Sequence, residues 1–231
     1  SLFKHYQPEG SNPPPPFPAV CCTSVNEVIV HGIPGPRRLV SGDILSLDIG
    51  CKLGDWCGDA AATYPVGEIP PEVQRLLDVT RGALDLAINT IGELMRQHAE
   101  KTGSGKFRAA VPWPQWNQVA TRMARYVRDA GFSVVEDFVG HGIGKKMHED
   151  PQVPNFPSRR SGKFEIRPGL VIAIEPMVNM GAKKVRGLPD RWTQQTADGM
   201  PSAHFEHTIA VTRSGAHVLT AGPGRAEDEP A

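Results

Sequence analysis

Five side chains of this sequence are of types that together bind divalent cations: Asp48, Asp59, His141, Glu175 and Glu206. Four carboxylates and one imidazole form an oxygen-rich donor set, which suits Mn, Fe or Co better than a structural zinc site. Four carboxylates can offset the charge of about two divalent ions, and paired metal ions are a common hydrolytic arrangement. If the fold brings these residues together, the chemistry indicated is metal-assisted hydrolysis.

Two of the acids lie on a predicted hairpin. Strand-like runs cover residues 44–51 and 56–66, and Lys52-Leu53-Gly54-Asp55 joins them as a tight turn. A turn centred on Leu53-Gly54 would place Asp48 directly opposite Asp59. Like charges in that position destabilise a sheet, and a shared cation would offset the repulsion. An exposed hairpin with scattered acids is the alternative interpretation.

The other three candidate donors lie in later segments. Glu175 follows the apolar run 170–174 and precedes a proline, and Glu206 lies within the largely apolar run 204–211. A carboxylate in an apolar strand is normally paired or bound to metal, so an ordinary salt bridge is the alternative for each. His141 lies in Gly140-His141-Gly142-Ile143-Gly144, where missing side chains permit a close backbone approach.

Two helices are predicted to support these segments. Apolar residues recur at helical spacing from Pro70-Pro71 to Met95. A second helix covers residues 116–130, where Val119, Met123, Tyr126 and Val127 form a buried stripe and Gly131 ends the helix. We expect residues 92–114 to form a surface insertion, with a loop from His98 onward.

The remaining strands favour the α+β class because they do not alternate regularly with helices. They are predicted at residues 133–139, 170–174 and 204–212. The predicted domain plan has an extended, proline-rich lead-in at 1–16, with a loose tail over 1–10, a catalytic domain at 17–220 and a disordered tail at 221–231.

Composition narrows the classes of function. The 231 residues carry 25 Lys and Arg against 25 Asp and Glu, which argues against nucleic acid or an anionic membrane as the main ligand. No apolar run reaches the length of a membrane span, and the first ten residues lack the apolar core of a secretion signal. The four cysteines fit neither a disulfide framework nor a zinc knuckle, so we expect buried free thiols in a reducing cytoplasm. They are Cys21, Cys22, Cys51 and Cys57.

The chain resembles the type I methionine aminopeptidases, a branch of the pita-bread metallopeptidases, over residues 17–220. Motifs in the family's order carry the resemblance: Cys22-Thr23-Ser24-Val25-Asn26-Glu27, His31-Gly32-Ile33-Pro34, Ser41-Gly42-Asp43-Ile44, Gly58-Asp59, Gly140-His141-Gly142-Ile143-Gly144, His148-Glu149, Ile174-Glu175-Pro176-Met177, Trp192-Thr193 and Phe205-Glu206-His207-Thr208.

The resemblance implies a pita-bread fold and two divalent ions, Co, Mn, Fe or Zn. In this family pattern Asp48 binds one ion, His141 and Glu175 bind the other, and Asp59 and Glu206 bridge both.

It also implies roles around the substrate. His31 would contact the substrate's backbone nitrogen, His148 would help stabilise the oxyanion, and Glu175 would accept a proton. Soft apolar walls suit a methionine thioether. Pro14 stands where the family has a second aromatic residue. The implied substrate-binding set is Phe17, Cys22, His31, Met147, His148 and Trp192.

The implied function is removal of the initiator Met from nascent chains with a small second residue. The expected partners are nascent N-termini and, transiently, the ribosome, with no DNA or membrane, and the protein is expected to be a cytoplasmic monomer. Because the family normally has about forty residues of helix ahead of Phe17, we expect an exposed apolar patch here.

Two rival functions stay open. An Xaa-Pro-type pita-bread aminopeptidase would use similar metal ligands. A catalytically silent pita-bread binding module would keep the fold, although such proteins usually lose ligands and all five are present here.

Overall fold

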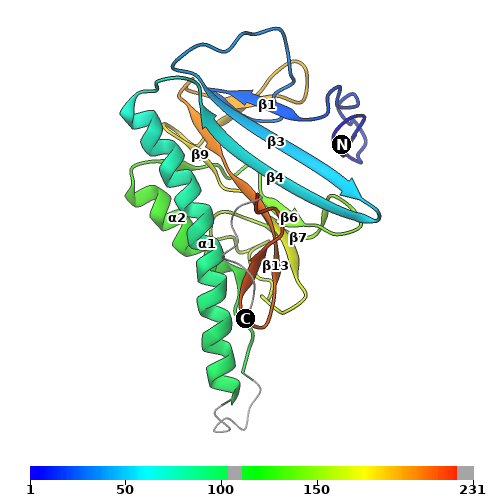
Figure 1. Ribbon diagram of the computed structural model, residues 1–231, viewed down its shortest axis with the longest axis vertical. Coiled ribbons are helices and arrows are strands. Elements are labelled where there is room, and N and C mark those ends of the chain that lie inside the picture. The colour runs from blue at the N-terminus through cyan, green and yellow to red at the C-terminus, as the bar shows by residue number, and fades with distance from the viewer. Residues whose placement is uncertain (104–110, 223–231) are drawn as a thin grey trace.

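One antiparallel sheet organises the molecule, and the computed structural model describes it over residues 1–103 and 111–222. Among the described residues its strands pair antiparallel, and helices pack beside it, as expected for the α+β class (Figure 1). The strands along the sheet are, in order, β1 (Cys22–Val25), β3 (Ile44–Leu53), β4 (Trp56–Pro65), β13 (Glu206–Val211), β8 (Val171–Ile174), β6 (Gly140–Gly142) and β7 (Glu149–Val153), and β14 (Ala216–Val218) pairs with β13.

Two small sheets flank this one. The first is built from β10 (Val185–Gly187), β11 (Gln194–Thr196) and β2 (Val28–Val30), and the second from β12 (Ser202–His204), β9 (Met177–Asn179) and β5 (Ser133–Val134). The predicted strand at 133–139 is therefore much shorter than expected, and the run at 204–212 is divided between β12 and β13.

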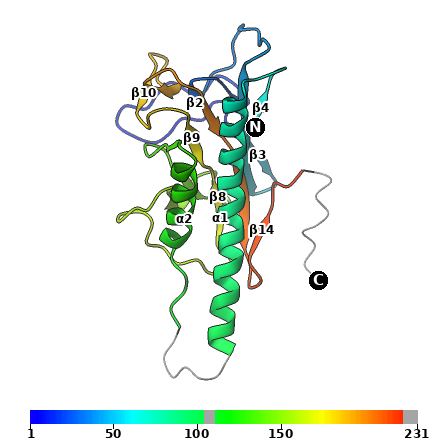
Figure 2. The same cartoon turned by 90° about the vertical axis from the view of Figure 1, so that its left-hand side faces the viewer.

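The two helices, α1 (Pro71–Gly103) and α2 (Trp116–Asp129), lie side by side against the sheet (Figure 2). Their buried stripes, which include Leu76, Ile91 and Met123, pack in one core with sheet residues such as Ile172 and Ile209. Apolar burial of this kind supplies the main favourable free energy of folding.

Two expectations about the helices are wrong. α1 continues to Gly103, so residues 98–103 are helix rather than loop, because Leu94, Met95 and His98 keep the buried spacing. Tyr126 is 40% exposed and does not belong to the buried stripe of α2. Part of the expected 98–114 loop, residues 104–110, lies outside the described residues.

The hairpin register differs from the prediction by two residues. The strands extend to Leu53 and Trp56, and the turn is the two-residue Gly54-Asp55, with Gly54 at φ 58°. Glycine adopts this left-handed conformation at little cost. Asp59 therefore pairs with Gly50, not with Asp48. A shift of two residues leaves the acids on the same face of the sheet.

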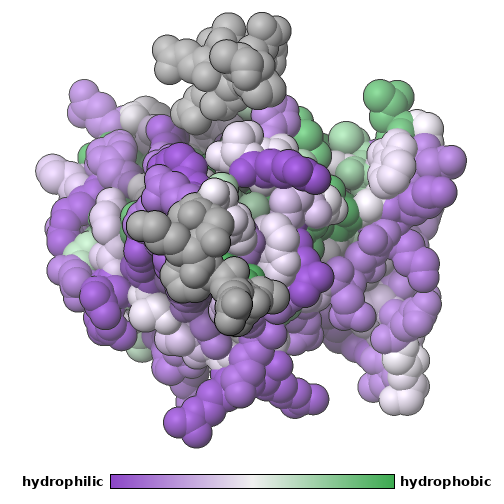
Figure 3. All heavy atoms as spheres, turned by 90° about the horizontal axis from the view of Figure 1, so that it is seen from below, coloured by the Kyte–Doolittle hydropathy of each residue, from purple (hydrophilic) through white to green (hydrophobic). Residues whose placement is uncertain are grey.

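That shared face of the hairpin points inward. Ser46, Gly50, Asp59 and Thr63 are buried on it, whereas the opposite face carries exposed apolar side chains. Ile49, Leu53, Trp56 and Tyr64 on that outer face are 52%, 86%, 64% and 52% exposed. Seen from below, hydrophobic side chains lie on the side of the molecule where the tip of the hairpin projects (Figure 3). The outer face of the hairpin is therefore apolar and exposed.

The N-terminal segment is more ordered than predicted. Residues 13–18 have no regular secondary structure, in keeping with an extended lead-in. Residues 1–10 are not a loose tail, because Phe3 is buried and the Leu2 amide donates to the Gly50 carbonyl. The expected C-terminal tail at 221–231 lies outside the described residues from 223 onward.

The four cysteines are free thiols, but only Cys22 is buried, and Cys51 is exposed, so the expectation of burial holds for one of them alone. No helix among the described residues is both long and apolar enough to cross a bilayer.

Gly140 provides a test of the sheet geometry. A Cβ at this position would collide with the Ala173 carbonyl oxygen on β8 and crowd Val153 on β7. Gly140→Ala should therefore destabilise the fold by about 2 kcal/mol, because overpacking a closely fitted site forces the backbone to move. Chemical denaturation measures this change. Gly92→Ala, inside α1 where a new Cβ meets only the flexible end of Arg96, is the matched control and should be neutral or stabilising.

Candidate metal centre and its cavities

Five neighbouring strands each deliver one candidate donor to the same region. Asp48, Asp59, Glu206 and His141 lie on β3, β4, β13 and β6, and Glu175 directly follows β8. Asp48 and Glu206 both pair with Ala61 of β4, so they flank that strand in one row. The small Ala61 side chain leaves room above the sheet.

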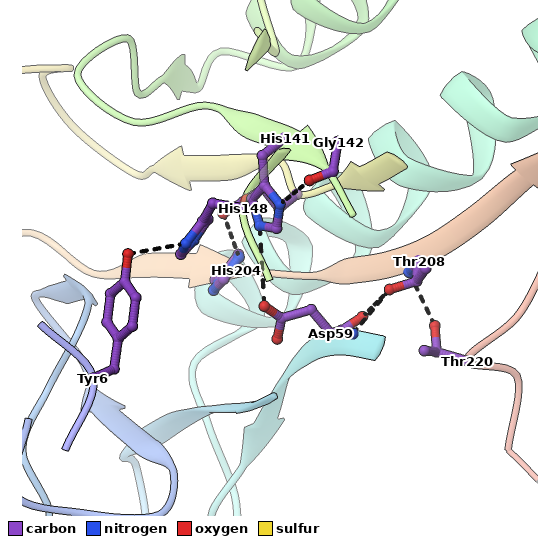
Figure 4. A network of polar contacts seen from close by, with 9 residues as sticks. Tyr6, Asp59, His141, Gly142, His148, His204, Thr208 and Thr220 are labelled. Carbon is purple, nitrogen blue, oxygen red and sulfur yellow. Dashed lines mark hydrogen bonds and ion pairs between the residues drawn. The ribbon is translucent and has the colours of Figure 1, made fainter. Parts of the chain in front are cut away.

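Candidate donor atoms lie around the His141 imidazole, and Figure 4 shows the Asp59 carboxylate pointing toward it. His141 Nε2 lies 4.0 Å from Asp59 Oδ2 and 3.7 Å from Glu175 Oε1. Donor atoms of Asp59, His141 and Glu206 lie within 4.8 Å of one another. His141 Nδ1 lies 2.9 Å from the Gly142 carbonyl oxygen, which can only accept a hydrogen bond. Nδ1 therefore donates, and the Nε2 lone pair is left for a cation.

Asp59 is held in place through its backbone. Its amide donates to Thr208 Oγ1 at 2.9 Å, and the Thr208 hydroxyl donates back to the Asp59 carbonyl at 2.8 Å. Thr220 Oγ1 accepts in turn from the Thr208 amide (Figure 4). These bonds join β4 to β13 beside the acidic residues, so the two bridging candidates Asp59 and Glu206 are positioned by the same pair of strands.

The carboxyl groups are strongly perturbed. Burial, reinforced by neighbouring carboxylates, raises the pKa of Asp48 to about 8 and that of Asp59 to about 7. Burial raises the pKa of Glu175 to about 7, although nearby His141 opposes the shift. Burial and the surrounding acids also raise the pKa of Glu206 well above its usual range. Four acids in one desolvated site thus lack compensating positive charge.

The donor set fits divalent cations. Among the described residues, the buried atoms Asp48 Oδ1 and Asp59 Oδ1 have no hydrogen-bond partner. Buried oxygens are rarely left unpaired, because desolvation without a compensating bond is costly. Cations among these oxygens would satisfy them and relieve the mutual repulsion of the carboxylates.

All eleven residues predicted for the site line one small cavity of about 70 Å³. Phe17, Cys22, Met147 and Trp192 form its apolar part and are all buried. The rings of Phe17 and Trp192 meet edge to face at 5.2 Å. This geometry matches a pocket for one apolar side chain.

Sequence reasoning missed two residues of this pocket, Phe3 and Tyr6, which also line it. Tyr6 supplies a second aromatic ring although Pro14 stands at the corresponding place in the sequence. Phe3 contacts Phe17 edge to face at 6.3 Å. The available signal was the presence of two aromatic residues three positions apart in a segment otherwise too polar to pack.

A second, open cavity of about 730 Å³ meets the same centre from another side. Asp48, His141, Glu175, His31 and His148 line both cavities. Three candidate donors, Asp48, His141 and Glu175, therefore stand where the small pocket meets the open cleft.

Two further histidines stand at this junction and are held neutral. Desolvation and the His204 imidazole lower the pKa of His31 to about 4. Partial desolvation, with His141 and His31 nearby, also lowers the pKa of His148, although that residue is largely exposed. Neutral imidazoles can each donate one hydrogen bond to a peptide group in the cleft.

Fold and site together define a metal-dependent peptidase of the pita-bread type. The sequence pattern of metallopeptidase family M24 matches residues 3–213, and the chain belongs to that family.

Several similar proteins carry the name methionine aminopeptidase. The chain is 43% identical over 204 residues to methionine aminopeptidase 1 of Bacillus subtilis (strain 168), covering 88% of this chain and 74% of that protein. Among solved structures, methionine aminopeptidase from Rickettsia prowazekii matches with a TM-score of 0.77 and 32% identity, over 89% of this chain and 75% of that one. Methionine aminopeptidase from Thermotoga maritima matches with a TM-score of 0.74 and 39% identity, over 87% of this chain and 74% of that one.

Prolidase from Pyrococcus furiosus shares the fold alone, at 18% identity and a TM-score of 0.61, over 88% of this chain and 49% of that one.

The raised carboxyl pKa values predict how the stability of the metal-free chain depends on pH. Between about pH 7 and about pH 8.5 these carboxyls lose protons in the folded state but are already ionised in the unfolded state. The folded state binds more protons, so its stability falls as pH rises. We expect the Tm of the metal-free chain to drop by at least about 3 °C across this window.

Calorimetry with and without added Mn²⁺ measures the effect. The cation should make Tm depend less on pH, because it favours ionised carboxylates at every pH in the window. His31 and His148 are neutral in the folded state and mostly neutral in the unfolded state there, so they oppose the trend only weakly. A Tm that stays level or rises in the metal-free chain contradicts the prediction.

Proposed function

We propose that the chain is a metal-dependent methionine aminopeptidase. The supporting observation is that all five candidate donors line a small pocket with one apolar side, and that three of them, Asp48, His141 and Glu175, also line an open cleft. A peptide whose first side chain fills the pocket would present its first peptide bond at the centre, with the rest of the chain in the cleft. The relatives named methionine aminopeptidase support the same activity.

We infer that two divalent ions occupy the site. Asp48 would hold one, His141 and Glu175 the other, with Asp59 and Glu206 shared. Co, Mn, Fe or Zn would each accept a set of this kind. When bound, the ions would supply Lewis acidity, which lowers the pKa of water and polarises a carbonyl. The unpaired Asp48 and Asp59 oxygens support this assignment.

The protein's own groups would do the remaining chemistry. Glu175, whose pKa is raised, stands beside His141 at the junction and is suited to accept a proton from the attacking water and pass it to the leaving amine. His31 would contact the substrate's backbone nitrogen, and His148 would donate from its neutral ring to the developing oxyanion. Phe17, Cys22, Met147 and Trp192 would enclose the methionine side chain.

The biological setting follows from this activity. The substrates would be nascent chains that begin with Met and a small second residue, met during a transient contact with the ribosome. The protein would act as a cytoplasmic monomer. Its catalytic domain would include residues 1–16 as well as 17–220, because Phe3 and Tyr6 line the pocket.

Peptide selectivity tests the proposed function against its Xaa-Pro rival. With the Mn²⁺-loaded chain we expect kcat/KM for Met-Ala-Ser to exceed that for Ala-Pro-Ala by at least about 100-fold, because only methionine fills the apolar pocket. Chromatography of the released amino acid measures both rates. A preference for Ala-Pro-Ala would overturn the substrate assignment, and no cleavage of either by a metal-loaded, folded chain would favour the silent module.

The bridging assignment is tested by Asp59→Asn and Glu206→Gln, which keep side-chain shape but remove a charge. Each should lose at least one metal equivalent by elemental analysis and lower kcat by about 100-fold or more. Asp55→Asn, at the exposed turn of the same hairpin, is the control and should keep both the bound metal and the wild-type kcat. Full turnover with two bound metals in either variant would refute the bridging role.

A further inference from the structure

The N-terminal segment is fixed onto the candidate active site by its backbone. The Leu2 amide donates to the Gly50 carbonyl of β3, and the His5 amide donates to the Phe17 carbonyl. The Phe17 amide donates back to the Tyr6 carbonyl at 2.9 Å. These bonds bring Tyr6 beside the pocket residues, although ten residues of chain separate it from Phe17.

The chain between Tyr6 and Phe17 has no regular secondary structure, yet one arginine holds it. Arg191 Nη2 donates to the Asn12 carbonyl at 2.8 Å, to Asn12 Oδ1 at 3.0 Å and to the Pro13 carbonyl at 2.9 Å. The neighbouring Trp192 donates through Nε1 to the Pro15 carbonyl at 2.7 Å. We call Asn12–Pro15 with Arg191 the clasp. Charge-assisted bonds such as those of Arg191 are stronger than neutral ones.

The clasped segment ends in a contact with the reactive centre. Tyr6 Oη lies 3.0 Å from His148 Nδ1, and the two rings are 5.4 Å apart (Figure 4). Tyr6 is half-buried, and burial together with Glu9 raises its pKa, so the phenol stays protonated and is able to donate. The Tyr6 ring also lies near the Trp192 ring, with 6.3 Å between the two ring centroids.

His148, the candidate oxyanion donor, is more exposed than His31, and its ring contacts that of His141 at 4.3 Å. It is exposed, whereas His31 is half-buried and meets Trp192 and Phe138 edge to face. Neutral imidazole exists as two tautomers, and the hydrogen bond at one nitrogen decides which nitrogen carries the proton. A hydroxyl that donates to Nδ1 leaves the proton on Nε2.

We propose that Tyr6 is a positioning residue that fixes the orientation and the Nε2–H tautomer of His148, and that the clasp holds Tyr6 in that position. The oxyanion role of His148 rests on the proposed function. The Tyr6 hydroxyl donates to Nδ1, so Nε2–H faces the cleft as a hydrogen-bond donor. The proline-rich loop thereby acts on the reaction without touching the substrate.

Tyr6→Phe removes the hydroxyl and keeps the ring in the pocket. We expect kcat for Met-Ala-Ser to fall about tenfold, as when a group that orients a reactive histidine is removed. KM should stay within about twofold, because the apolar contact with the substrate remains. Tyr64→Phe, an exposed tyrosine on β4, is the matched control and should behave as wild type.

A spectroscopic readout tests the contact without turnover. In the ¹⁵N-histidine spectrum of the Zn²⁺-loaded chain, His148, assigned with His148→Gln, should show the Nε2–H tautomer. In Tyr6→Phe its ring nitrogens should shift towards a mixture of tautomers, while Tyr64→Phe leaves them unchanged. This measurement needs no substrate, so failure of the proposed aminopeptidase activity would leave its result intact.

Arg191→Ala tests the clasp, with the exposed Arg160→Ala as control. Residue 191 has a φ of 66°, and both arginine and alanine carry a Cβ there. The substitution therefore leaves the backbone strain unchanged. Arg191→Ala should lower kcat less than Tyr6→Phe, and the double variant should equal Tyr6→Phe, because residues that act through one contact are non-additive.

Three results would overturn the proposal. The first is an unchanged His148 spectrum in Tyr6→Phe. The second is a kcat for Tyr6→Phe within twofold of wild type, or an equal rise in KM that places the effect in substrate binding. The third is additivity of Arg191→Ala and Tyr6→Phe, which would separate the clasp from Tyr6.

Discussion

The structure depends on one electrostatic constraint, the burial of four carboxyl groups beside the imidazoles of His141 and His204. In a low-dielectric site, charged groups of one sign repel strongly and are poorly solvated. The raised pKa values of Asp48, Asp59, Glu175 and Glu206 express that cost. The antiparallel sheet makes the arrangement possible, because five neighbouring strands each contribute one donor from the same side. Bound cations would offset this repulsion and so stabilise the folded state.

The position of this cluster determines what chemistry it can perform. An apolar pocket on one side and an open cleft on the other allow one side chain to enter and the remaining peptide to extend away. In the proposed function, the soft lining of Cys22, Met147 and Trp192 would select the first side chain. Membership of metallopeptidase family M24 and the identity to methionine aminopeptidases agree with this geometry.

The proline-rich N-terminal segment links two parts of the molecule that are remote in sequence. Arg191 and Trp192 hold its loop, and its Tyr6 and Phe3 complete the pocket. Prolines lose little conformational freedom on ordering, so such a loop can be held by a few hydrogen bonds. The segment therefore belongs to the active site rather than leading into it.

The sequence by itself determined the donor types, the α+β class, the two helices and the faces of the hairpin, because residue chemistry and periodicity are local properties. It placed the turn wrongly and paired Asp48 with Asp59, since register depends on which residues adopt a left-handed turn. It also ended the first helix too early and missed Phe3 and Tyr6. Only the tertiary structure decided that these rings enter the pocket, because long-range packing and hydrogen bonds from Arg191 and Trp192, not local propensity, order the segment that carries them.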